Sequence, residues 1–187
     1  MKYGCIEIGV ADFDYEMGKH PTGISIEPHP VYSRDLLHRA PEGWRVAQYA
    51  VGPVAGWDTL YYVDPDEITT EPKWIRGCSM MGQPHPRLLE HCPEKIKDVL
   101  VQTITPREMC ELFDVTSVEW LKIDAEGMDI DIALAWMRTA PMPERITFDV
   151  TAITPMGQMD ALDKILKQMG YECIDEFECN YTYARKC

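Results

Sequence analysis

The run WLKIDAEGMDIDIALAW, from Trp120 to Trp136, constrains the fold more than any other part of the chain. An apolar stretch ends in Asp124, Glu126 and Gly127 follow, and apolar residues then recur at helical spacing. This pattern predicts a buried strand, a tight turn and a helix. In an open α/β sheet, ligands bind outside the carboxyl ends of the strands. We therefore expect Asp124 and Glu126 at a functional rim of such a sheet.

The rest of the chain alternates strands and helices, which predicts an α/β fold with a mainly parallel sheet covered by helices. The last two strands predict an antiparallel hairpin that turns near Asn180. The strand at 58–64 is expected to pair with the strand before it through the turn at 53–56. Strands are predicted at 4–10, 22–28, 44–52, 58–64, 99–104, 145–152, 171–178 and 180–185, and helices at 30–40, 105–113 and 156–170.

Local signals fix some of these helix ends. Pro30 suits the first turn of its helix. Thr105 and Glu108 form a capping box at the next one, and Gly170 is typical of a helix carboxyl end. Asp129 and Asp131 fall in the first turns of the helix that follows Gly127, where the helix dipole favours negative charge.

Length and composition indicate one domain over residues 1–187. The formal net charge of -13 argues against nucleic acid or an anionic membrane as a partner. No apolar run is long enough to span a bilayer, and the first residues are typical of a strand rather than of a secretory signal. The 7 cysteines are odd in number and form no CxxC pair, which favours reduced thiols and a cytoplasmic protein.

Residues 65–97 interrupt the alternation with several prolines and glycines. A loop of this length is usually functional or disordered. The segment also carries Trp74, Met80, Met81, His85 and His91, which a disordered segment seldom needs. We interpret it as a lid or substrate-contact loop, with an irregular connection as the alternative.

A first chemical constellation lies at the ends of the first two strands. Glu7 and Gly9 end one strand, and Glu27 ends the next. In nucleotide-binding α/β folds such a glycine lets the backbone approach a ligand, and the later acid accepts ribose hydroxyls. The alternative is that Glu7 and Glu27 are solvated strand ends. The glycine fingerprints of dinucleotide and phosphate loops are absent, which disfavours a nucleotide-sugar or NAD enzyme. A nucleoside ligand without phosphates stays open, and S-adenosylmethionine is such a ligand.

The segments EIGVADFD, ISIEPHP, AQYAVG, TPREM, LKIDAEGMDIDIAL and LKQMGYE together resemble the FkbM-type methyltransferases, in the order of that family. The resemblance implies the Rossmann-like class I methyltransferase fold, with a seven-stranded, mainly parallel sheet, an antiparallel carboxyl-terminal hairpin and helices on both faces. It also implies an S-adenosylmethionine-dependent O-methyltransferase that acts on a hydroxyl of a small molecule or sugar.

The resemblance assigns roles to matching positions. Asp124 and Glu126 would face the transferring methyl group and the acceptor as catalytic residues. Glu7 and Gly9 would lie beside the methionine part of the cofactor, and Glu27 would hold its ribose. Pro28 and His29 would lie near the adenine. Ala50 and Val51 would lie on the other side of the adenine.

One position departs from the family. Phe13 stands where the family usually has a second glycine, and Gly18, Pro21 and Gly23 leave little room for the helix that should follow. A bulky side chain there would narrow the cofactor pocket. The alternative function is therefore a non-catalytic, methyltransferase-like binding or assembly module.

Transfer to a hydroxyl needs a base in addition to positioning. Asp124 or Glu126 is the first candidate, and His85 or His91 from the long loop is the second. We expect no metal; the alternative is a hard cation shared by Asp124 and Asp149. The expected partner is a small-molecule or glycan acceptor, and the sequence leaves assembly into a homo-oligomer open.

Overall fold

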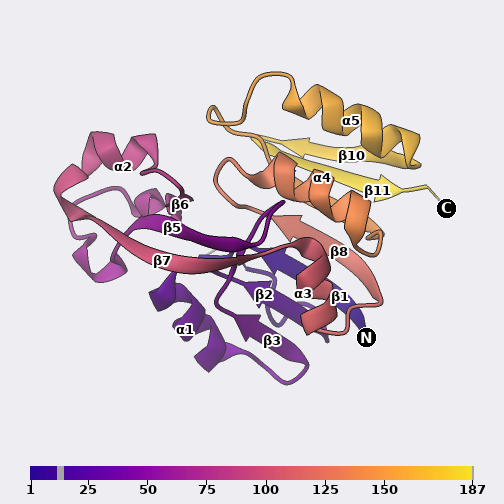
Figure 1. Ribbon diagram of the computed structural model, residues 1–187, viewed down its shortest axis with the longest axis horizontal. Helices are drawn as coiled ribbons and strands as arrows, with labels where there is room; N and C mark the ends of the chain where they lie inside the picture. Colours follow the sequence, from indigo (N-terminus) through magenta and orange to yellow (C-terminus); the bar gives the residue numbers. More distant parts are fainter. Residues whose placement is uncertain (12–14, 187) are drawn as a thin grey trace.

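The computed structural model describes residues 1–11 and 15–186, so the role predicted for Phe13 lies outside the described residues. A seven-stranded sheet forms its centre, in the order β10-β11-β9-β8-β1-β2-β3 (Figure 1). Strands β1, β2, β3, β8 and β9 run parallel, and β11 is antiparallel to both β9 and β10. The predicted mainly parallel sheet with a carboxyl-terminal hairpin is confirmed. The strands are Lys2–Ile8 (β1), Gly23–Ile26 (β2), Trp44–Ala47 (β3), Ser117–Ile123 (β8), Arg145–Asp149 (β9), Tyr171–Phe177 (β10) and Asn180–Arg185 (β11).

Helices pack on both faces of this sheet. The main core joins β1, β8 and β9 to α3, α4 and α5, with Trp136 of α4 fully buried. A smaller cluster on the other face joins Cys5 of β1 to Leu36 of α1 and to Met17. No helix in the described part of the chain is long and apolar enough to cross a bilayer. The helices that pack on the seven-stranded sheet are Pro30–Arg39 (α1), Pro106–Leu112 (α3), Asp129–Thr139 (α4) and Gln158–Gln168 (α5).

The predicted helix signals act as expected. Pro30 occupies the first turn of α1, and Thr105 and Glu108 form both bonds of a capping box at α3. Gly170 follows the end of α5 with φ +86°, a left-handed conformation that glycine adopts without strain. These local signals set one end each of α1, α3 and α5.

A second, four-stranded sheet is built in the order β4-β7-β5-β6. The expected pairing of 58–64 with the strand before it is wrong, because β7 lies between β4 and β5 and pairs with both. The alternating strand β7 is long enough to cover β5 over its full length, which the short β4 is not. The strands are Ala50–Val51 (β4), Gly56–Val63 (β5), Met80–Met81 (β6) and Ile96–Ile104 (β7).

The segment from 65 to 97 is folded, with short helical pieces around a small core of its own. That core joins Val63 and Ile75 to Leu88 and Cys92, all of them buried. The segment is therefore neither disordered nor a plain connection. Its helical pieces are Pro65–Glu67 (η1), Lys73–Gly77 (η2), Pro86–His91 (α2) and Pro93–Lys95 (η3), beside β5 and β7 in Figure 1.

Strand β1 meets β8 in a contact that only glycine permits. Asp124 N donates to the Ile8 carbonyl at 2.8 Å, and a Cβ on Gly9 would lie 1.8 Å from the Asp124 carbonyl oxygen. Gly9 also has φ +74°. In the described part of the link from β1 to β2 the backbone then forms turns and no helix. Gly9 therefore allows the carboxyl ends of β1 and β8, which carry the candidate site, to lie in direct contact.

Replacing Gly9 with Ala should lower the free energy of unfolding by more than about 3 kcal/mol, since the added carbon overlaps backbone that cannot move independently. Chemical denaturation followed by circular dichroism measures this.

The matched control is Gly18→Ala, because Gly18 has φ +83° but nothing within 4 Å of an added Cβ. That change should cost only about 1 kcal/mol of backbone strain. Equal losses for the two variants would show that the contact with Asp124 is unimportant.

Candidate functional site

A cavity of about 400 Å³ opens at the carboxyl ends of β1, β2 and β8. Its volume lies in the usual range for small-molecule sites. One wall is the rim of the sheet, and the other comes from the folded segment 65–97. The cavity brings together seven of the nine predicted site residues, namely Gly9, Glu27, Pro28, Ala50, Val51, Asp124 and Glu126.

Glu27 lies at this rim with its carboxylate held by the backbone. Its Oε2 accepts hydrogen bonds from Val10 N at 2.8 Å and Ala11 N at 2.9 Å, and its Oε1 accepts one from His29 N at 2.7 Å. The residue is buried, which raises its pKa, while the three backbone donors act in the opposite direction. Since a carboxylate offers about four acceptor positions, one position on Oε1 remains for a ligand.

Glu7 points away from the cavity, because neighbouring residues of a strand face opposite sides of the sheet. Its carboxylate accepts hydrogen bonds from Glu16 N and from Ser25 Oγ. Burial raises the pKa of Glu7 to about 7. Glu7 thus lies against the link from β1 to β2 and not in the cavity, where the sequence predicted it.

His29 also lies outside the cavity. Its Nδ1 accepts from Val31 N at 3.1 Å and caps α1, and its ring stacks on Tyr32 with centroids 4.1 Å apart. The side chain is fully buried, which lowers its pKa to about 4. Because His29 caps α1, its side chain does not line the cavity, where the sequence predicted a contact with the adenine of a cofactor.

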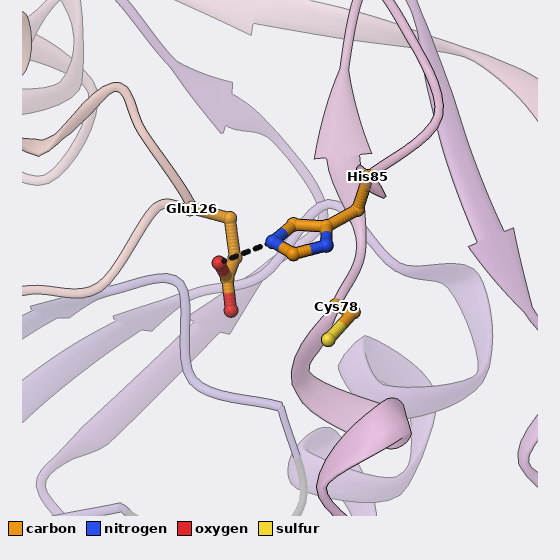
Figure 2. Close-up of side chains that lie close together, drawn as sticks. All are labelled: Cys78, His85 and Glu126. Carbon is orange, nitrogen blue, oxygen red and sulfur yellow. Dashed lines mark ion pairs between the residues drawn. The ribbon is translucent and has the colours of Figure 1, made fainter. Parts of the chain in front are cut away.

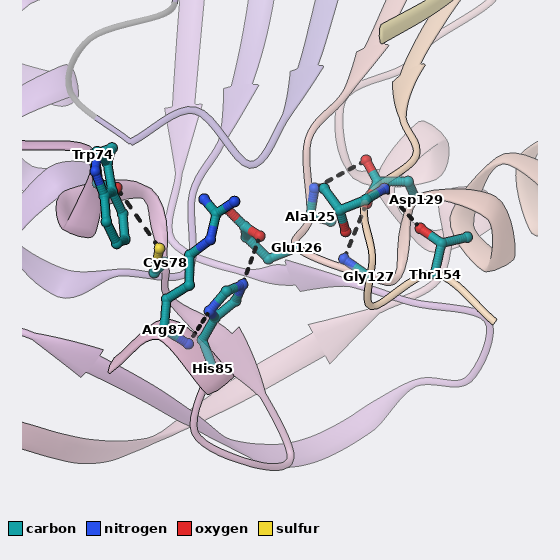
Figure 3. A network of polar contacts seen from close by, with 10 residues as sticks. Trp74, Cys78, His85, Arg87, Ala125, Glu126, Gly127, Asp129 and Thr154 are labelled. Atoms are coloured by element: carbon teal, nitrogen blue, oxygen red, sulfur yellow. Dashed lines mark hydrogen bonds and ion pairs between the residues drawn. The ribbon is translucent and has the colours of Figure 1, made fainter. Parts of the chain in front are cut away.

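The turn after β8 is held by the carboxylate of Asp129, for which the sequence indicated only a favourable interaction with the helix dipole. Asp129 Oδ1 accepts from Ala125 N at 3.2 Å, and Oδ2 accepts from Gly127 N at 3.3 Å (Figure 3). Asp129 Oδ1 also accepts from Asp149 N at 3.3 Å. Asp129 thereby ties the ends of β8 and β9 to the start of α4. Glu126 in this turn has φ +43°, a left-handed conformation that costs a residue with a side chain about 1–2 kcal/mol.

The side chain of Glu126 meets His85 from the folded segment. His85 Nε2 lies 3.3 Å from Glu126 Oε2, and Cys78 lies beside them (Figure 2). His85 Nδ1 accepts from Arg87 N at 3.1 Å, so the neutral ring carries its proton on Nε2 and donates it to Glu126. Although the three side chains have the composition of a metal site, this tautomer leaves Nε2 without a lone pair for a cation. The arrangement instead orients the carboxylate of Glu126, which lines the cavity.

Three acids crowd the same rim. Burial, and then the charges of Asp129, Glu126 and Asp149, raise the pKa of Asp124 to about 8. Burial raises the pKa of Asp129 to about 7, and it raises that of Asp149 as well. Asp124 and Asp149 belong to no group of three close metal ligands in the part of the chain that the structure describes. The rim can therefore exchange protons near neutral pH.

The folded segment supplies cavity residues that the sequence pattern did not assign. Arg87 lies over the Trp74 ring at 5.0 Å, and both line the cavity. His91, a predicted alternative base, does not line the cavity; its ring lies 5.2 Å from that of Trp74. The aromatic residues noted in the segment were the one signal for this wall; the direction of each side chain depends on the fold.

Comparison with protein families matches residues 7–173 to the methyltransferase FkbM domain. No curated protein matches the chain. The match spans β1 to β10 and so includes the cavity, the turn after β8 and the folded segment.

The free energy of unfolding should fall as pH rises from about 4 to about 8. Carboxyls that ionise near pH 4 in the unfolded chain keep their protons in the folded one up to the raised pKa values of Asp124 and Asp129. Asp124→Asn should therefore raise the free energy of unfolding by about 1–3 kcal/mol more at pH 8.5 than at pH 5. Denaturation series at both pH values measure this.

Asp163→Asn is the control, because Lys167 and Tyr183 lower the pKa of that carboxyl. This change should destabilise the protein at pH 7. A wild-type stability that rises from pH 5 to pH 8.5 would contradict the assignment of raised pKa values to the rim.

Backbone strain at Glu126 can be measured separately. Both Glu126→Gly and Glu126→Ala remove the contact with His85, but only glycine accepts φ +43° without cost. The glycine variant should be more stable by about 1 kcal/mol. At Asp131 in α4, in contrast, the alanine variant should be more stable than the glycine variant by about 1 kcal/mol, since glycine weakens a helix. The alanine variant of Glu126 proving the more stable would rule the strain out.

Proposed function

The chain belongs to the FkbM methyltransferase family, and we propose that it is an S-adenosylmethionine-dependent O-methyltransferase for a hydroxyl of a small molecule or sugar. The observation that carries this proposal is the single cavity that joins Glu27 at the end of β2 to Asp124 and Glu126 at the end of β8. A donor held at the first position would present its methyl group at the second.

The residues present fit an adenosyl donor. Glu27 keeps one acceptor position on Oε1 for a ribose hydroxyl, since Val10, Ala11 and His29 occupy the others. Accepting both ribose hydroxyls would require one backbone bond of Oε2 to break. Pro28, Ala50 and Val51 add an apolar wall of the kind that an adenine ring packs against. S-adenosylmethionine would supply an electrophilic methyl group on a positively charged sulfur.

The acids of the rim suit the other half of the reaction. An acceptor hydroxyl loses its proton as its oxygen is alkylated, so a base must lie within hydrogen-bond reach. Glu126 offers the carboxylate oxygen that His85 does not hold, and Asp124, with a pKa near 8, is matched to proton exchange around neutral pH. His85 itself is committed to Glu126 and Arg87 N, so we assign it to orienting Glu126.

The chain would otherwise act by positioning and by excluding water. Asp129 fixes the turn that presents Glu126, and the wall of Trp74 and Arg87 covers the cavity from the side of the folded segment. A carboxylate at the rim would favour a cationic sulfur beside it. Covering the site would strengthen these interactions, because they act in a medium poorer in water.

A non-catalytic, methyltransferase-like module is the second candidate. The observations that favour it are the hydrogen bonds of Glu27 to the backbone of Val10 and Ala11 and the turns in the described part of the link from β1 to β2. Such a module would not bind the adenosyl ligand. The cavity at Gly9 and Glu27 supports the enzyme over this candidate.

Titration calorimetry with S-adenosylhomocysteine tests the proposal. We expect micromolar-range binding to the natural protein, and Glu27→Ala should weaken it at least about tenfold, the cost of one buried charge-assisted hydrogen bond.

Glu119→Gln is the control, because Glu119 is a partly exposed acid paired with Lys2 at the other end of β8, and its change should leave the affinity unaltered. No binding to the natural protein would favour the non-catalytic module.

A further inference from the structure

A second cavity, of about 300 Å³, adjoins the first. It lies between the turn that links β4 to β5 and the start of α4. Its lining is largely apolar, with Pro53, Val54, Ala55 and Trp57 on one side. The first cavity, in contrast, contains the acids of the rim and two arginines.

The two cavities share walls. Ala50, Val51, Met81 and Met128 line both of them. Met128 follows Gly127 directly, and its terminal methyl would lie 3.5 Å from a Cβ on Gly52. Two of the four shared residues, Met81 and Met128, are therefore flexible thioether side chains, which adapt readily to differently shaped apolar ligands.

The mouth of the second cavity exposes apolar side chains without any cover. Val54 is 76% exposed and Trp57 is 66% exposed. Exposed apolar groups are ordinary when they are scattered, but here they border an apolar cavity that shares four lining residues with the candidate active site. A ligand that enters both cavities would meet carboxylates at one end and apolar surface at the other.

We propose that the second cavity holds the apolar body of the methyl acceptor, so that the acceptor is an amphipathic alcohol and not a free sugar. This inference rests on the proposed function. The hydroxyl lies with Glu126 and Asp124 in the first cavity, and the apolar part passes Met81 and Met128 toward Val54 and Trp57. The polar end fixes the orientation, and burial of the apolar part supplies most of the affinity.

A series of primary alcohols tests this with simple probes. Calorimetry measures the binding of 1-butanol, 1-hexanol and 1-octanol in the presence of saturating S-adenosylhomocysteine. We expect affinity to rise about fourfold for each added methylene, the factor for burying one such group. Val54→Asp, which places a charge at the mouth, should remove this dependence on chain length.

Leu100→Asp is the matched control. Leu100 lies on neighbouring β7, is 61% exposed and is absent from the lining of both cavities, so its change should leave the series unaltered. Affinity that does not depend on chain length would overturn the inference, and so would an equal loss in both variants. If the alcohols bind as expected while S-adenosylhomocysteine does not bind, the apolar site stands and the proposed function fails.

Discussion

The approach of β1 to β8 at Gly9 is the constraint on which the rest of the site depends. The backbone of Gly9 lies so close to the Asp124 carbonyl that no side chain fits between them. This contact sets the end of β8 beside the end of β1, and β2 brings Glu27 to the same rim. Asp129 then holds the turn that follows, through three backbone donors on two segments. Gly9 thus permits the close approach of the two strands, and Asp129 stabilises the strained turn that presents Glu126.

Much of this architecture could be predicted, because it rests on local rules. The strand, turn and helix around Asp124, the capping box at Thr105 and the terminal hairpin follow from residue periodicity and helix-end chemistry. Glu7 and His29 show where such rules end. Glu7 belongs to the correct strand, but the alternation of its side chains turns it to the other face. His29 sits at the correct strand end, but it caps α1 instead of facing the cavity.

The folded segment could not have been placed from the sequence, because its contribution depends on contacts far along the chain. His85 meets Glu126, and Trp74 and Arg87 form a wall opposite the sheet. Aromatic and histidine residues signalled that the segment was more than a linker, yet their directions depend on β7 pairing between β4 and β5. That same pairing creates the apolar cavity next to the acidic rim. The folded segment therefore orients the candidate base, and the second sheet shapes the space that would select the acceptor.

The central claim is that one cavity holds an adenosyl donor with its reactive end toward Asp124 and Glu126. A crystal structure of the protein with S-adenosylhomocysteine tests this most directly. We predict a ribose hydroxyl within hydrogen-bond distance of Glu27 Oε1 and the sulfur facing the turn after β8. A ligand bound elsewhere, or a ribose that makes no contact with Glu27, would contradict the account.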